Sequence, residues 1–127
     1  LHKVLGDQVS QRGSDITAER ARFDFAFDRK MTDDEIKKVD DFVNGAIASN
    51  LQVTMEEMPT EDAKKSGALF FYKGNYGDKV KVYTIGDFSR EICGGPHVSN
   101  TGEIGRFRII KEESSSAGIR RIRAIIE

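Results

Sequence analysis

The sequence predicts an α+β domain with a mostly antiparallel sheet and helices packed on one side of that sheet. Two observations carry this prediction. Several segments alternate apolar and polar residues with a period of two, which is typical of strands with one buried face. Another segment has apolar residues at three- and four-residue spacing, which is typical of an amphipathic helix. The predicted order is strand, helix, strand, helix and then several strands, and this order favours the α+β class.

The N-terminal part predicts a helix end, a turn and a strand. Gly6 is typical of the residue that ends a helix, because glycine adopts the left-handed conformation at little cost. Gly13-Ser14-Asp15 predicts a turn. Residues 21–28 predict a strand. The aromatic side chains on one face of this strand are Phe23, Phe25 and Phe27.

The clearest predicted helix begins at Thr32. Glu35 follows three residues later, and this capping-box spacing lets each side chain accept a hydrogen bond from a free amide of the first turn. Ser49-Asn50 marks the end of the helix. The apolar residues that share one side of it are Ile36, Val39, Phe42, Val43, Ala46 and Ile47.

The rest of the chain predicts further strands and one short helix. Residues 51–56 alternate and predict a strand. Residues 59–66 predict a helix, with Pro59 near its first turn and Gly67 beyond its last. The remaining predicted elements are a loop at residues 74–78, strands at residues 79–85, 104–110 and 118–126, and a turn at Ser114-Ser115-Ser116.

Length and composition limit the class of protein. A chain of 127 residues fits one domain, so residues 1–127 are expected to form a single domain around one core. The net charge of −1 excludes a globally basic nucleic-acid binder. The lone cysteine, Cys93, excludes an intramolecular disulfide framework and favours a reducing, cytoplasmic compartment. The longest apolar run, residues 68–72, is far too short to cross a membrane, so no membrane partner is expected.

Cys93 and His97 lie four residues apart across two glycines. Thiolate and imidazole are ligands that zinc prefers, and the glycines allow a tight loop that directs both side chains at one ion. Two ligands do not complete a tetrahedral site, however. Two other interpretations stay open: a pair in which the imidazole activates a nucleophilic thiol, and a cysteine that acts as a small buried hydrophobic residue.

The C-terminal third carries an excess of positive charge. On strands these side chains would line a sheet face, which is compatible both with contact to phosphates and with an ordinary solvated surface. Near the N-terminus, Gln11 and Ser14 are ordinary loop residues by their chemistry alone. Between residues 106 and 123 the acids Glu112 and Glu113 stand against the basic residues Arg106, Arg108, Lys111, Arg120, Arg121 and Arg123.

Several motifs occur along the chain in a specific order. Cys93-Gly94-Gly95-Pro96-His97-Val98 is followed by Asn100-Thr101-Gly102-Glu103-Ile104-Gly105. The other segments of the pattern are residues 4–6, 9–14, 22–25, 88–91 and 117–122. Together they closely resemble the editing domain of alanyl-tRNA synthetases and of their free-standing relatives, over nearly the whole chain. The resemblance implies the fold of the synthetase second additional domain.

This resemblance also implies a function, a metal and a partner. Members of the family hydrolyse the ester of tRNA for alanine wrongly charged with serine or glycine, because a pocket built for a methyl group cannot strongly reject such close analogues. The resemblance implies that Cys93 and His97 are two of four zinc ligands, and that Gln11, Ser14 and Arg120 belong to the catalytic pocket. It implies that the C-terminal basic residues contact the acceptor end of the tRNA. ATP and magnesium are implied only for the aminoacylation domain of the parent synthetase.

The chain departs from the family pattern in three places. Pro96 stands where the family usually has threonine, so a backbone hydrogen bond is lost there. Residues 71–75 lengthen the stretch that follows the predicted short helix. The family's His-x-x-x-His pair of zinc ligands is expected just upstream of Leu1, and His2 matches neither of its histidines. We therefore expect an editing domain truncated at its N-terminus, with impaired metal binding and activity.

Three functions are compatible with these residues. The favoured one is the editing domain of an alanyl-tRNA synthetase, with the remainder of the synthetase as its partner. The alternatives are a free-standing trans-editing deacylase and a non-catalytic RNA-binding module that keeps the basic strands. A related editing domain of threonyl-tRNA synthetases shares the fold, but the motif at residues 100–105 favours the alanyl branch.

Overall fold

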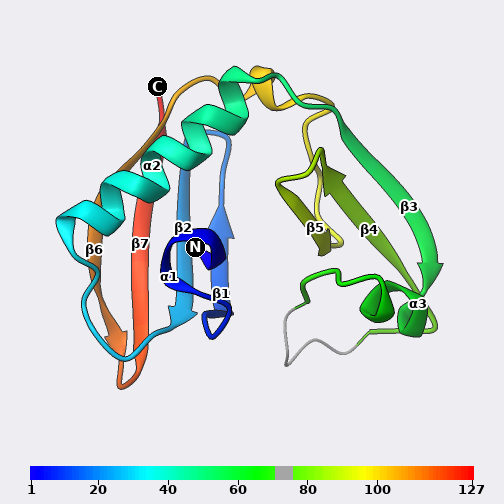
Figure 1. Cartoon of the computed structure of the whole chain (residues 1–127), viewed down its shortest axis with the longest axis horizontal. Helices are drawn as coiled ribbons and strands as arrows, with labels where there is room; N and C mark the ends of the chain where they lie inside the picture. The colour runs from blue at the N-terminus through cyan, green and yellow to red at the C-terminus, as the bar shows by residue number, and fades with distance from the viewer. Residues whose placement is uncertain (71–75) are drawn as a thin grey trace. The chain divides into compact units, whose positions relative to one another are not determined.

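The protein is described by a computed structural model that covers residues 1–70 and 76–127. Its contacts divide into two compact units. The first unit comprises Leu1–Gly45 and Ile104–Glu127, and the second comprises Ala46–Glu103. Each unit has its own antiparallel sheet, as Figure 1 shows. The predicted α+β class and antiparallel pairing are confirmed.

The expectation of one core was wrong, because the described residues form two separate hydrophobic clusters. Period-two alternation shows that a strand has a buried face, but it does not show which strands pair. The strands that the sequence predicts for one sheet are therefore divided over two sheets. That residues 1–127 act as one editing-type domain stays a prediction.

The first unit is a four-stranded sheet with two helices. The strand order is β1-β2-β7-β6, and each neighbouring pair is antiparallel (Figure 1). The strands are β1 (Ser10–Ile16), β2 (Arg20–Ala26), β6 (Phe107–Ser116) and β7 (Ile119–Ile126), and the helices are α1 (His2–Leu5) and α2 (Asp33–Ala48). Gly6 follows α1 with a φ of 108°, a conformation that favours glycine, so the predicted helix end is confirmed.

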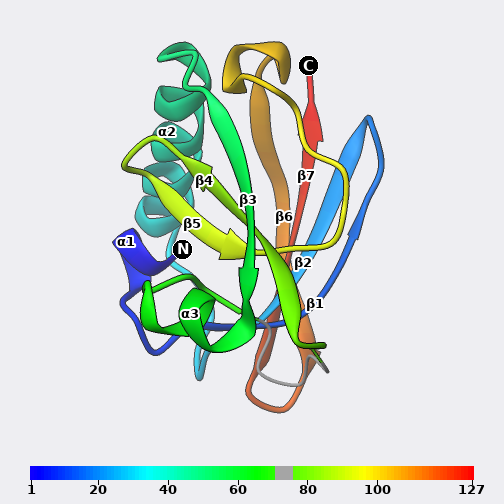
Figure 2. The same cartoon turned by 90° about the vertical axis from the view of Figure 1, so that its right-hand side faces the viewer.

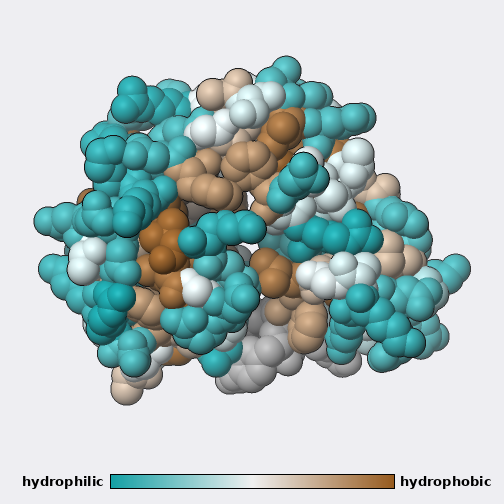
Figure 3. Space-filling model, in the orientation of Figure 1, coloured by the Kyte–Doolittle hydropathy of each residue, from teal (hydrophilic) through white to brown (hydrophobic). Residues whose placement is uncertain are grey.

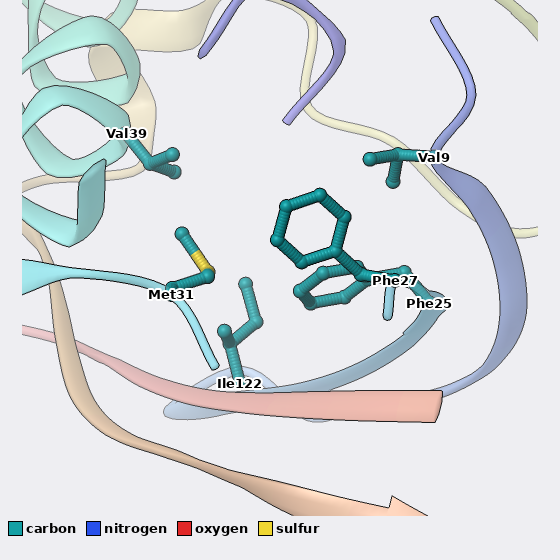
Figure 4. Packing of buried hydrophobic residues seen from close by; sticks show 6 residues of the cluster. All are labelled: Val9, Phe25, Phe27, Met31, Val39 and Ile122. Atoms are coloured by element: carbon teal, nitrogen blue, oxygen red, sulfur yellow. The ribbon is translucent and has the colours of Figure 1, made fainter. Parts of the chain in front are cut away.

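The core of this unit forms where β2 and β7 face α2. Phe25 and Met31 are almost completely buried beside Val39 of α2 and Ile122 of β7, as Figure 4 shows. Burial of one such side chain stabilises the fold by about 1.5–3 kcal/mol. Partly buried residues of α1 also pack against this cluster. The aromatic face predicted for β2 is therefore the inner face of the sheet.

Two predicted turns of the first unit were wrong. Gly13-Ser14-Asp15 lies within β1, and the sheet accommodates Gly13 through a register shift between Gln11 and Gly13. Ser114-Ser115-Ser116 forms the end of β6, because Ser114 and Ser116 still pair with β7. The turn of this hairpin comes later, at Gly118, where φ is 73°.

The second unit is a three-stranded antiparallel sheet with α3 packed on one face. The strands follow the order β3-β4-β5, and Figure 2 shows them with α3. They are β3 (Val53–Pro59), β4 (Lys79–Ile85) and β5 (Ser89–Ile92). The helix α3 (Thr60–Lys65) follows β3, and a 3-10 helix at Thr101–Glu103 comes after β5. The core residues are Ala63, Ala68, Val80, Val82 and Ile92.

Most of the predicted elements of the second unit are confirmed. The strand at residues 79–85 has the predicted bounds, and α3 lies within the predicted helix with Gly67 beyond it at a φ of 84°. Asn50 ends α2 with a positive φ of 47°. Of the predicted loop at residues 74–78, Gly74 and Asn75 lie outside the described residues, as does the whole segment 71–75.

Hydrophilic residues cover most of the surface visible in Figure 3. This agrees with a composition in which 32% of the residues are charged. No helix among the described residues is both long enough and apolar enough to cross a membrane.

The predicted capping box at the start of α2 is confirmed. The amide of Glu35 donates to Oγ1 of Thr32 at 3.1 Å, and the amide of Thr32 donates to Oε1 of Glu35 at 2.9 Å. Arg29 adds two hydrogen bonds to the same carboxylate, at 2.8 and 2.9 Å. The Arg29 bonds first, and the Thr32 amide next, lower the pKa of Glu35 to about 2.

Replacing Glu35 with glutamine should therefore destabilise the protein near neutral pH, by about 1 kcal/mol or less because the pair is partly exposed. The folded-state pKa lies below the ordinary value of 4.5, so this contribution is present above pH 4.5 and is lost as the pH falls toward 2. Urea denaturation of both proteins across this range should show the difference shrinking with acidity. Glu19→Gln, on the exposed β1–β2 turn, is the matched control. A difference that does not change with pH would contradict the assignment.

Candidate functional site

Cys93 directly continues the sheet of the second unit. Its amide donates to the carbonyl of Lys81 at 3.2 Å, one residue beyond the end of β5. The buried neighbours Val82 and Ile92 pair across β4 and β5 and face α3. Because side chains alternate along a strand, the Cys93 thiol lies on the opposite face. It is a free, half-buried thiol and is not among the buried residues of the core.

His97 is brought to the same face. Its ring stacks on that of Tyr83, with centroids 3.7 Å apart and an interplanar angle of 18°. Tyr83 is in β4, two residues from the position opposite Cys93, and so projects from the face that carries the thiol. Nδ1 of His97 lies 2.9 Å from the carbonyl oxygen of Gly95. Since a carbonyl can only accept, Nδ1 carries the proton and Nε2 keeps its lone pair.

These two residues suit zinc in kind but not in number. A thiolate and an imidazole with a fixed tautomer are typical zinc ligands. Among residues 1–70 and 76–127, however, no group of three His, Cys, Asp or Glu side chains could hold a metal ion. A zinc site needs at least three protein ligands. Cys93 and His97 are therefore at most part of a site that other donors would have to complete.

Gln11, Ser14 and Arg120 lie in the first unit. Nε2 of Gln11 donates to Oγ of Ser14 at 3.3 Å, across the register shift of β1. In the register of the sheet Gln11 pairs with Phe25, and Phe25 pairs with Arg120. Paired residues project from the same face, so all three predicted residues share the inner face of the sheet. Cys93 and His97 belong to the other unit.

Arg120 is held by a buried carboxylate. Its Nε and Nη2 donate to the two oxygens of Glu112 at 2.7 Å each, and the Glu112 side chain is 1% exposed. The amide of Met31 donates to the same carboxylate at 3.2 Å. Burial raises the pKa of Glu112, but the hydrogen bonds of Arg120 and Met31 together outweigh burial, so the pKa is lowered.

Most of the C-terminal basic residues are neutralised in the same way. Each partner is a carboxylate on the same strand, on a neighbouring strand of the sheet or at the last residue. The ion pairs are Arg108 with Glu127, Lys111 with Glu113, Arg120 with Glu112, Arg121 with Asp24, and Arg123 with Glu113. The excess of positive charge in the sequence is therefore largely compensated on the sheet.

Sequence reasoning missed one residue in each unit. Tyr83 supports His97 from another strand, and its place in an alternating pattern was the only signal. Glu112 was counted as one acid in a basic run. The pattern Glu-x₇-Arg on two strands of a hairpin could have indicated the pair with Arg120, but only if the hairpin turn had been placed at Gly118.

The sequence of the chain is similar to that of known aminoacyl-tRNA synthetases. Residues 80–123 match the model for the threonyl and alanyl tRNA synthetase second additional domain. The chain is 60% identical over 127 residues to an alanine–tRNA ligase of Treponema denticola, covering all of this chain and 21% of the relative. An alanine–tRNA ligase of Borreliella burgdorferi is 55% identical over 130 residues, covering 99% of this chain and 22% of the relative.

These matches identify the class of domain. The chain contains a second additional domain of the threonyl and alanyl tRNA synthetase family. Its relatives then indicate the branch: along its whole length the chain corresponds to the region of alanine–tRNA ligase that contains this domain. It spans about a fifth of the length of these curated relatives.

The buried pair of Glu112 and Arg120 should contribute more to stability than its exposed neighbour. Glu112→Ala would leave a mostly buried guanidinium and the Met31 amide without a partner, so the free energy of unfolding should fall by about 3 kcal/mol. The control is Glu113→Ala, which removes a carboxylate whose side chain is 27% exposed, and it should lower the free energy of unfolding much less than Glu112→Ala. Urea denaturation measures both. Equal losses would contradict the structural role of Glu112.

Proposed function

We propose that this chain is the editing domain of an alanine–tRNA ligase and hydrolyses the ester of tRNA for alanine charged with serine or glycine. One observation carries the proposal: the whole chain aligns with alanine–tRNA ligases at up to 60% identity, around a region that matches the second additional domain. Cys93 and His97, which share one face of the second unit's sheet, support it as a metal-binding pair.

In this proposal Cys93 and His97 contribute two zinc ligands, the thiolate and Nε2. The hydrogen bond from Nδ1 to the Gly95 carbonyl and the stack on Tyr83 hold the ring in one orientation. When bound, zinc polarises a carbonyl or lowers the pKa of a water molecule. Further ligands are required, and we propose that they are histidines supplied by the ligase upstream of this chain.

Gln11, Ser14 and Arg120 are proposed to contact the aminoacyl ester. The Gln11 amide donates to Ser14, so the hydroxyl proton of Ser14 can be directed at another acceptor. Such a hydroxyl can recognise the polar side chain that distinguishes serine from alanine. The Glu112 carboxylate fixes the guanidinium of Arg120, which makes Arg120 a rigid donor.

A free-standing deacylase and a non-catalytic RNA-binding module remain as competing functions. The relatives reported above are alanine–tRNA ligases, which favours the ligase. The discriminating measurement is the length of the protein that precedes Leu1: several hundred residues would identify a ligase, whereas a short leader would identify a free-standing editor.

Cys93→Ala in the complete ligase should reduce the hydrolysis of seryl-tRNA for alanine by more than about tenfold, because a metal ligand is lost. Binding of the tRNA should be unchanged. Ser99→Ala, a change on the same exposed loop, is the matched control and should retain activity. Hydrolysis is followed by release of labelled serine. An unimpaired deacylase would refute the role of Cys93, and a ligase that binds tRNA but never deacylates it would favour the RNA-binding module.

The 127-residue chain by itself should carry well below one zinc per molecule after gel filtration, because two ligands bind the ion weakly. Extending the chain upstream with the ligase sequence should raise the content to about one per molecule. His97→Ala in the extended chain should lower it again. Elemental analysis measures all three. Tightly held, stoichiometric zinc in the 127-residue chain would overturn the proposed incompleteness of the site.

A further inference from the structure

The outer face of the first unit's sheet, opposite Phe25, is densely charged. Asp24 is only 7% exposed, and its carboxylate accepts two hydrogen bonds from Arg121, at 2.7 and 2.9 Å. The Arg121 bonds lower the pKa of Asp24. On β6, the carboxylate of Glu113 accepts a hydrogen bond from Arg123 of β7 at 2.7 Å. The carboxylates nearest the centre of this face are therefore already engaged.

Two arginines of β2 are not compensated in this way. Arg20 is exposed, and its side chain forms no ion pair within the described part of the chain. Arg22 approaches Asp24 only at 3.9 Å, where Arg121 already occupies the carboxylate. Nε of Arg22 is buried and has no hydrogen-bond partner among the described residues. A buried donor without a partner is unfavourable. The Arg22 side chain as a whole is 35% exposed, so a ligand can reach other parts of it.

Both arginines line one cavity of about 350 Å³. Arg20 and Arg22 are two residues apart on β2, so their side chains project from the same face. Arg123 lies beside them across β2 and β7. Ile110 and Ile125 add an apolar wall, and Ile110 is 52% exposed. The cavity therefore combines positive charge with an exposed apolar surface.

This combination fits a nucleotide better than a free inorganic anion. Guanidinium groups bind phosphate oxygens with charge-assisted hydrogen bonds. A free phosphate makes no favourable contact with the apolar wall, whereas a ribose or a base edge can pack against it. A polynucleotide can also meet Arg20 and Arg22 with successive phosphates of one strand.

We propose that the cavity binds the RNA backbone, with Arg20 and Arg22 as the phosphate contacts; that this RNA is a tRNA rests on the proposed function. The sequence predicted phosphate contacts by the C-terminal basic run, but that run is largely paired with carboxylates. The phosphate contacts are therefore assigned to Arg20 and Arg22 of β2. Gln11 and Arg120 lie on the opposite, inner face of the sheet, so the proposed phosphate contacts and the proposed aminoacyl contacts use different faces.

The test compares RNA binding by the 127-residue chain and its variants. Labelled tRNA for alanine is titrated at several salt concentrations by fluorescence anisotropy. The double variant Arg20→Gln/Arg22→Gln should bind roughly tenfold more weakly or worse. The slope of log K against log salt should become shallower by about 1 for each lost phosphate contact. Asp15 also lines the cavity and pairs with Arg22 in the register of the sheet, so Asp15→Asn, which removes its negative charge, should strengthen binding.

The matched control is Lys37→Gln/Lys38→Gln, which removes two positive charges from the exposed side of α2. It should leave the slope nearly unchanged. Arg20→Gln by itself, at an exposed position, keeps the test valid if the double variant does not fold. Equal losses in both double variants, or an unchanged slope for Arg20→Gln, would overturn the proposal.

Competition separates the possible ligands. Excess inorganic phosphate should displace the RNA only weakly, because it lacks the apolar contact and the second phosphate. Efficient displacement by inorganic phosphate or by polyglutamate, at equal charge concentration, would overturn the RNA assignment. Hydrolysis by the complete ligase is measured in parallel. Cavity-dependent RNA binding without deacylation would refute the proposed function alone, whereas deacylation with normal RNA binding by the variants would refute this inference alone.

Discussion

The fold of the first unit depends on the alternation of side chains along β2. Phe25 projects into the cluster with Met31 and Val39, while Asp24 and Arg22 project from the other face. A shift of one residue in the pairing of β2 with β7 would place charges in the core and aromatic rings in water. Burial of the rings therefore fixes the register. The register in turn places Asp24 opposite Arg121, and the ionic face follows from the hydrophobic one.

Ion pairing explains why a chain with so many charges can use few of them for binding. Burying Glu112 is unfavourable unless its two oxygens are satisfied, and Arg120 and the Met31 amide satisfy them. A guanidinium that is needed to neutralise a buried carboxylate cannot also be released to a polyanion without cost. On β2, Arg20 and Arg22 form no hydrogen bond of this kind to a carboxylate of the described residues, so their guanidinium groups can meet phosphates at lower cost.

Elements defined by local patterns could be predicted from the sequence, and features defined by pairing could not. The capping box of Thr32 and Glu35 is a contact within four residues, so the start of α2 was predicted correctly. The register shift after Gln11 depends on which strand lies alongside, so Gly13 resembled a turn. The polar residues at Ser114–Ser116 resembled a turn for the same reason, although the ladder with β7 continues through them.

The candidate site residues also divide into those that local spacing predicts and those that depend on neighbouring strands. Cys93 and His97 are close in sequence, and the predicted convergence of their side chains required only a short loop at the end of a strand. Their support by Tyr83 comes from the neighbouring strand and could not be found from spacing. The two groups of candidate residues lie in different units: Gln11 donates to Ser14 in one, and Cys93 and His97 belong to the other. Variants within one unit therefore test each group separately.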